Sequence, residues 1–134
     1  MKINDEKFST LQMALLIDDW KTRYHVNSKH ELIFQCKPLL TNVRFPSEFM
    51  HKNHMANRGF SNLPDTIEKP SECWSYWVNP DPKKQKDVVR NYILRGDNIN
   101  YVVTTESGII KKAIAVVNSK LSRYRKGLII YRSK

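Results

Sequence analysis

The sequence predicts an α+β fold in which N-terminal helices pack on a four- to five-stranded antiparallel sheet. Apolar residues recur at helical intervals in the first half of the chain, and after Pro70 the pattern becomes typical of strands. The later runs are closely spaced and joined by turn-length loops, so neighbouring strands can pair as a meander. A chain of 134 residues with 40% hydrophobic residues suits one domain. We expect a single domain over 1–134, mainly helical over 1–70 and an antiparallel sheet over 71–134.

The first expected element is an amphipathic helix from about Glu6 to Arg23. Acidic residues precede it, which suits the positive end of a helix dipole, and Ser9 and Thr10 are available near its start. Its apolar positions recur every three to four residues and should pack on the sheet: Phe8, Leu11, Leu15, Leu16 and Trp20. A helix that binds a partner is the alternative interpretation.

Three shorter elements are expected before the sheet. A short strand covers Glu31 to Cys36. Pro46 ends whatever precedes it, and Ser47 can cap a short helix that begins there. A second short helix is expected from Leu63 to Glu68, closed by Pro70.

Five strands are expected in the second half of the chain. β-branched and aromatic residues fill these runs, and the segments between them contain the Pro, Gly, Asn, Asp and Ser residues that favour turns. The predicted strands are Cys73 to Val78, Val88 to Leu94, Ile99 to Thr105, Ile109 to Val117 and Leu128 to Tyr131.

Positive charge is concentrated in the second half of the chain. Residues 1–70 contain ten Lys or Arg and eight Asp or Glu, whereas residues 71–134 contain thirteen and five, so that +2 and +8 make up the net charge of +10. Such a one-sided excess indicates a polyanionic partner, nucleic acid before membrane. A basic, solvated surface without a partner is the alternative. The candidates for nucleic-acid binding are Lys111, Lys112, Arg123, Arg125 and Lys126.

The composition argues against several other classes. No run of about eighteen apolar residues exists that could span a bilayer, and the polar first ten residues are unlike a secretory signal. We therefore expect a cytoplasmic protein, or one delivered without a cleaved leader, and no membrane partner. Cys36 and Cys73 are too few for a disulfide framework, and no C-x-x-C or H-E-x-x-H spacing occurs. No metal site and no cofactor are expected.

Alternation along the strand from Val88 to Leu94 places Arg90 and Tyr92 on one face. A guanidinium and a phenol two residues apart suit phosphate binding together with proton transfer or base stacking. Thr104 or Thr105 should face the same side, where a hydroxyl can hydrogen-bond a phosphate oxygen. A solvated Arg, a Tyr at the core rim and a Thr chosen for strand propensity are the alternatives.

His51 and His54 lie three residues apart in the helix expected after Pro46. Residues at this spacing share a helix face, so both imidazoles can point at one site. A histidine with a pKa near neutrality can serve as a general acid or base. We therefore regard His51 and His54 as candidate catalytic residues, although a lone histidine is more often structural.

The order of these features resembles the barnase-like ribonucleases, a group that includes colicin-type, EndoU-type and RelE-type enzymes. The likeness covers Ser47 to Lys134, especially a His-bearing polar helix, L-P-D-T-I-E-K-P before a Trp strand, R-N-Y-I, and a final R-Y-R-K-G-L-I-I-Y. It is closest to the versions attached to phage head proteins and bacterial polymorphic toxins. The resemblance implies helices packed on a four- or five-stranded antiparallel sheet. It also implies a protein that acts in a bacterial cytoplasm.

The resemblance also implies a metal-independent endoribonuclease, in which a 2′-hydroxyl attacks the adjacent phosphorus and leaves a 2′,3′-cyclic phosphate. Its helix histidine would be His51 or His54, its strand pair Arg90 and Tyr92, and its basic turn Arg125 to Gly127, with Thr104 as a looser match. No carboxylate base is expected on the sheet, because Glu106 lies beside a turn and Glu72 precedes the first predicted strand. A histidine or tyrosine would then serve as the base.

The leading hypothesis is therefore a metal-independent endoribonuclease of phage or toxin type. Its expected partners are RNA, tRNA included, and an immunity or antitoxin protein. One alternative is a non-catalytic nucleic-acid-binding protein, such as a phage accessory or anti-defence factor. Another is an inhibitor that presents a basic face to an acidic protein.

Overall fold

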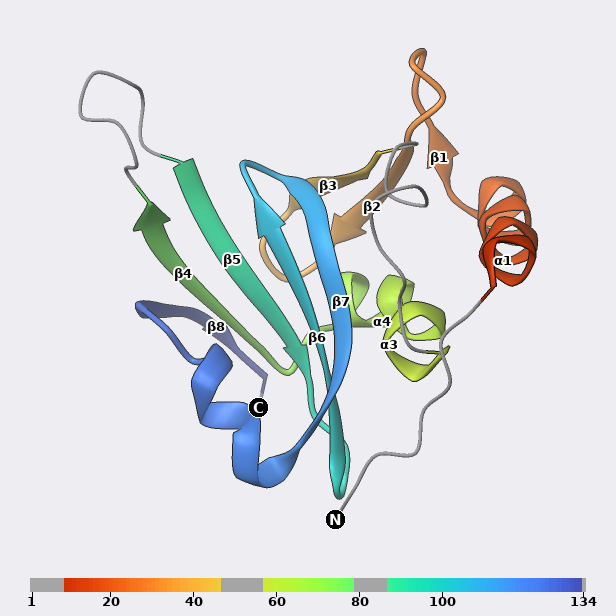
Figure 1. The fold of residues 1–134 in the computed structure, drawn as a ribbon. Helices are drawn as coiled ribbons and strands as arrows, with labels where there is room; N and C mark the ends of the chain where they lie inside the picture. Colours follow the sequence, from red (N-terminus) through yellow and green to blue (C-terminus); the bar gives the residue numbers. More distant parts are fainter. Residues whose placement is uncertain (1–8, 47–56, 79–86, 134) are drawn as a thin grey trace.

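In the computed structural model, which describes residues 9–46, 57–78 and 87–133, eight strands form one mixed sheet (Figure 1). The strands are β1 (His25–Val26), β2 (Leu32–Cys36), β3 (Thr41–Phe45), β4 (Glu72–Val78), β5 (Asp87–Leu94), β6 (Ile99–Glu106), β7 (Ile109–Val117) and β8 (Leu128–Arg132). Their order across the sheet is β1-β2-β3-β7-β6-β5-β4-β8. Strands β3 and β7 are parallel, and the other neighbours are antiparallel.

The predicted four- to five-stranded antiparallel sheet is therefore wrong in size and in pairing. The part expected to be mainly helical supplies β1, β2 and β3, and β3 joins the sheet through its parallel contact with β7. The last strand pairs with β4 rather than with its sequence neighbour β7. Both errors concern strands of five residues or fewer, whose pairing depends on partners that are distant in sequence.

Local signals nevertheless placed several elements correctly. The predicted strand from Ile109 to Val117 and the predicted helix from Leu63 to Glu68 have the observed bounds of β7 and α4 (Leu63–Glu68). The turn between β6 and β7 is also as predicted, because Ser107 and Gly108 both adopt positive φ. Two consecutive positive φ angles suit the tight turn of a β-hairpin.

Helix α1 (Thr10–Arg23) begins at Ser9, whose hydroxyl accepts a hydrogen bond from the Gln12 backbone N–H. The Gln12 side chain accepts in return from the Ser9 N–H and completes a capping box. Its buried face carries Met13, Ile17 and Trp20, whereas two residues of the predicted apolar stripe, Leu11 and Leu15, are exposed. Two apolar stripes have helical spacing here, so periodicity did not decide which one packs on the sheet.

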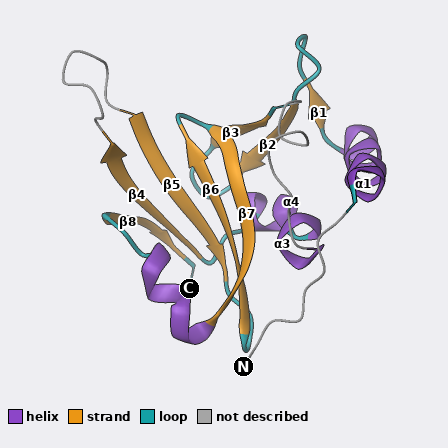
Figure 2. Cartoon of the chain, viewed as in Figure 1, coloured by secondary structure: helices purple, strands orange, loops and turns teal. Residues whose placement is uncertain are grey.

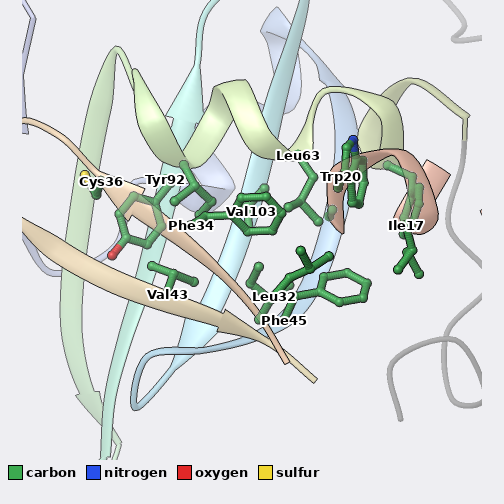
Figure 3. Close-up of a cluster of buried hydrophobic side chains, with 14 of the residues drawn as sticks. Ile17, Trp20, Leu32, Phe34, Cys36, Val43, Phe45, Leu63, Tyr92 and Val103 are labelled. Carbon is green, nitrogen blue, oxygen red and sulfur yellow. The ribbon is translucent and has the colours of Figure 1, made fainter. Parts of the chain in front are cut away.

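Helical segments cover the sheet on both faces (Figure 2). On one face α1, α3 (Asn57–Ser61) and α4 enclose the larger core, part of which Figure 3 shows. In this core Trp20 stacks on Phe60 at 5.0 Å and meets Phe34 and Phe45 edge-on. On the other face the 3-10 helix η1 (Asn118–Tyr124) packs Leu121 against strands β5, β6 and β7. We call these the helix face and the η1 face.

Candidate nucleic-acid interface

A cavity of about 610 Å³ lies where β4, β8 and the end of β5 meet. Glu72 begins β4, and it pairs in register with Arg132 at the end of β8. Arg95 follows β5 directly, and Arg125 is the residue that ends η1. We call this the arginine cavity, and it is lined by Ser71, Glu72, Trp74, Arg95, Arg125, Arg132 and Ser133.

An ion pair forms one wall of the arginine cavity. Arg125 Nε donates to Glu72 Oε1 at 2.9 Å, and Arg125 Nη2 donates to Glu72 Oε2 at 2.6 Å. Trp74 Nε1 donates a further hydrogen bond to Glu72 Oε1 at 2.9 Å. Such a bidentate pair fixes the plane of the guanidinium group. Because Glu72 is only 4% exposed, the glutamate anchors Arg125 to the sheet.

The charge balance of the arginine cavity favours an anion. Burial pushes the pKa of the Glu72 carboxyl upward, but hydrogen bonds from Arg125 and Trp74, together with the charge of Arg125 and of Arg95, bring it below its ordinary value. The hydrogen bond to Glu72 raises the pKa of Arg125. The carboxyl is thus ionised at neutral pH, and three arginines against one glutamate leave a net positive cavity.

A buried polar network holds the end of η1 in place beside this cavity. Asn91, which is 3% exposed, donates from Nδ2 to the backbone carbonyl of Tyr124 at 2.9 Å. Thr104 Oγ1 donates to Asn91 Oδ1 at 2.7 Å. Arg125 follows Tyr124 directly, so the network contributes to the position of its side chain. Thr104, predicted as a catalytic residue, therefore has a structural contact on the η1 face.

Arg90 and Tyr92 share the helix face, as the alternation predicted, and line a second cavity of about 290 Å³. Thr105 pairs with Arg90 in register and lines the same cavity, so Thr105 rather than Thr104 accompanies Arg90. Tyr92 is 1% exposed, and burial raises the pKa of its phenol although a hydrogen bond with Arg90 opposes the shift. The Tyr92 hydroxyl thus stays protonated and is unsuited to act as a base.

The two cavities lie on opposite faces of the sheet. Tyr92 belongs to the helix-face core, whereas Ile93, the next residue, packs on the η1 face and pairs in register with Glu72. Arg90 and Arg125 therefore cannot hold the same phosphate. The second cavity, which we call the Arg90 cavity, is lined by Thr41, Asn42, Val88, Arg90, Tyr92, Thr105, Ser107 and Gly108.

The other predicted binding residues lie on η1, on β7 and between η1 and β8. Lys112 places its Nζ 5.6 Å from the centre of the Tyr124 ring, and Lys126 places its Nζ 6.0 Å from that of Tyr76. Arg123 is exposed on η1, and Lys111 is exposed on β7. Lys112 and Lys126 each place a cation beside an aromatic ring, and surfaces that bind single-stranded nucleic acid combine these two kinds of side chain.

Sequence reasoning missed Glu72, Arg95 and Arg132. The predicted strand began at Cys73, one residue too late, so Glu72 was judged to lie outside the sheet. Alternation of Glu72 with Trp74 along the strand was the available signal. Arg95 directly follows a strand and Arg132 ends one, but no local pattern indicates that these two residues, 37 positions apart, line one cavity.

Two predicted catalytic residues, His51 and His54, lie outside the described residues. Within residues 9–46, 57–78 and 87–133, no group of three or more His, Cys, Asp or Glu side chains is placed to hold a metal ion. In the same ranges no helix is long and apolar enough to cross a membrane.

Comparisons of the chain with protein-family models, with curated proteins and with solved structures found no match. The resemblance to barnase-like ribonucleases therefore remains a prediction from sequence motifs. The arginine cavity, the Arg90 cavity and the basic residues near η1 are the features from which a function can be inferred.

Proposed function

We propose that this protein is a metal-independent endoribonuclease that holds an RNA phosphate in the arginine cavity. The observation that supports this most directly is the meeting of three arginines with an ionised carboxylate in one cavity. Cleavage by an internal 2′-hydroxyl needs a group that accepts a proton and a cationic clamp for the charge that develops on phosphorus. Glu72 is the carboxylate of the cavity that would meet the first requirement, and Arg95, Arg125 and Arg132 fit the second.

In the proposed reaction, the Glu72 carboxylate accepts the proton of the 2′-hydroxyl group. The 2′-oxygen then bonds to phosphorus while the bond from phosphorus to the 5′-oxygen breaks, and a 2′,3′-cyclic phosphate remains. The departing 5′-oxygen takes up a proton, and His51 or His54, each predicted as a general acid or base, would donate it. The arginines stabilise the negative charge on the phosphoryl oxygens throughout.

A non-catalytic RNA-binding protein is the second candidate. The Glu72 oxygens already accept three hydrogen bonds, two from Arg125 and one from Trp74. A carboxylate engaged in this way is well suited to positioning Arg125 and less suited to accepting a proton. This alternative predicts affinity for RNA without turnover.

The first experiment measures binding of single-stranded RNA as a function of salt. Each neutralised phosphate contributes about 0.7 to the slope of log K against log salt, so removing two arginines should flatten the slope by about 1.4. We expect this change for the double variant Arg95→Ala and Arg132→Ala. The matched control removes two exposed lysines from distant elements, Lys21→Ala and Lys29→Ala, and should keep the slope. Equal slopes for the two variants would contradict a phosphate site in the arginine cavity.

The second experiment tests cleavage of total RNA and of tRNA in the presence of EDTA. We expect products that end in a 2′,3′-cyclic phosphate, and a rate reduced by about 10²-fold or more in Glu72→Gln, because a general base contributes at least that much. Circular dichroism checks that the variant is folded, and RNA affinity is measured beside the rate.

Each other outcome of the cleavage experiment assigns a different role. RNA binding with no cleavage by the wild-type protein would reject the ribonuclease function and favour a non-catalytic RNA-binding protein. Cleavage that survives Glu72→Gln and is lost in Arg90→Ala would move the reaction to the Arg90 cavity. Cleavage that EDTA abolishes would contradict the metal-independent mechanism.

A further inference from the structure

Strand β8 leaves an apolar sheet edge exposed to solvent. It is the last strand of the described sheet, beyond β4 (Figure 1). Three consecutive side chains are largely accessible, since Leu128 is 76%, Ile129 39% and Ile130 36% exposed. Proteins usually protect such edges with very short strands, charges, bulges or covering segments. The opposite edge is the very short strand β1, whereas β8 has five residues and a bulge between Ile129 and Tyr131.

The backbone of this edge is available for pairing. The Ser133 N–H donates to the Ser71 carbonyl at 2.8 Å and therefore points toward β4. In an antiparallel strand the backbone groups of successive residues point to opposite sides, so the N–H and C=O groups of Arg132 point outward. An extended segment of another chain can accept and donate hydrogen bonds there.

The charges around β8 select the kind of segment that fits. Exposed Lys126 precedes the strand and exposed Arg132 ends it. Two copies paired edge to edge would bring the Lys126 and Arg132 charges of one copy near those of the other, and like charges on paired strands are destabilising. A strand that carries carboxylates would form favourable pairs at the same positions.

We propose that β8 docks an extended, acidic segment of another protein by strand addition. The apolar residues of such a segment would cover Leu128, Ile129 and Ile130, and its carboxylates would meet Lys126 and Arg132. Arg132 also lines the arginine cavity, so a docked strand obstructs that cavity and competes with RNA. Only this last consequence rests on the proposed function.

A short synthetic peptide with central valines flanked by glutamates is the probe for this surface. Fluorescence anisotropy in the absence of RNA should show binding, and amide hydrogen exchange should slow in β8. The same peptide with prolines in place of the central valines cannot form the ladder and should not bind. We expect Ile130→Asp to weaken the peptide's affinity by about tenfold, because it removes apolar burial and adds repulsion.

The matched control is Leu11→Asp, which replaces another exposed leucine, 69% accessible on α1, with the same charge. It should leave peptide binding unchanged. Equal binding of the proline peptide, or equal weakening by the two aspartate variants, would overturn strand addition in favour of general charge attraction. A dimer of the free wild-type protein in light scattering that Ile130→Asp dissociates would also overturn it, with a second copy as the occupant.

The docking surface and the proposed function fail independently. Peptide binding without RNA binding would retain the docking surface and reject the RNA site. RNA binding without peptide binding would do the reverse. When both bind, the peptide should displace RNA from the wild-type protein, and RNA retained at saturating peptide would contradict the overlap at Arg132.

Discussion

Replacing Arg125 with alanine is expected to destabilise the protein by about 3 kcal/mol and to remove most of its affinity for RNA. The substitution leaves the Glu72 carboxylate, whose side chain is 5% exposed, without its two hydrogen bonds from the guanidinium group. Breaking a buried pair costs about 3–5 kcal/mol, and the low end applies because the Arg125 side chain is 32% exposed. Urea denaturation measures the change.

The pH dependence of stability identifies the cause of this loss. The pKa of Glu72 is lowered in the folded protein, so its contribution is fully present above the ordinary carboxyl pKa and disappears as the pH falls through the lowered value. The wild-type protein should therefore lose stability in this acidic range. The Arg125→Ala variant should lose less stability there, because Glu72 already lacks the guanidinium group that lowers its pKa. An identical dependence of stability on pH for both proteins would show that the ion pair of Glu72 and Arg125 is not the cause of the loss.

Two further variants separate the ion pair from the binding role of Arg125. Arg132→Ala removes an exposed arginine of the same cavity and should weaken RNA binding with a stability change below about 1 kcal/mol. The double variant Glu72→Met and Arg125→Met should recover most of the stability, since an apolar pair of similar size can replace a buried ion pair. It should not recover RNA binding. Full stability in Arg125→Ala itself would show that the pair is not structural.

Replacing Gly127 with alanine is expected to cost about 3 kcal/mol and to detach β8 from β4. Gly127 has a φ of +82°, and an added Cβ would lie 2.7 Å from the Cβ of Tyr76 and 2.9 Å from the backbone carbon of Ser75. Backbone strain and overpacking therefore act together. Because β8 carries Arg132, RNA affinity should fall as well. Denaturation and hydrogen exchange of the β8 amides measure the two effects.

Gly108→Ala is the matched control for Gly127→Ala. Gly108 also has a positive φ, of +77°, but the nearest atom to an added Cβ is the Asn42 carbonyl oxygen at 3.8 Å. Only backbone strain remains at this position, so we expect a loss of about 1 kcal/mol and no effect on RNA binding. Equal losses for both glycine variants would mean that β8 does not approach β4 as closely as the structure shows.

The candidate site illustrates how far local sequence patterns reach. Alternation correctly placed Arg90 and Tyr92 on one face, because that relation depends only on the two-residue repeat of a strand. Alternation left open whether Thr104 or Thr105 lies on the same face. The register between β5 and β6 places Thr105 opposite Arg90. The basic C-terminal cluster contained Arg125, but nothing nearby in the sequence indicates that it binds Glu72, which lies 53 residues earlier.

In the first half of the chain, some features depend on neighbouring residues and others depend on contacts with remote segments. The short helix α4 depends on residues within a few positions of each other, and the sequence predicted it. The capping box of Ser9 and Gln12 is equally local, but the predicted helix began at about Glu6 and so had Ser9 inside it. The choice between Leu11 and Met13 as the buried side of α1 depends on the sheet beneath it, and so does the pairing of β3 with β7. Both depend on contacts with remote segments, which periodicity does not encode.

The sequence by itself predicted the five strands after Pro70 to within one residue at each end, the turn at Gly108 and the concentration of positive charge near the C-terminus. These follow from side-chain alternation, from turn residues and from a count of charges, all of which act over a few residues. Only the tertiary structure decided that η1 carries the chain back so that β8 pairs with β4. That pairing brings Arg132 and Arg125 to Glu72. The arrangement is stable because it buries apolar side chains on both faces of the sheet, and these side chains come from segments that are distant in sequence.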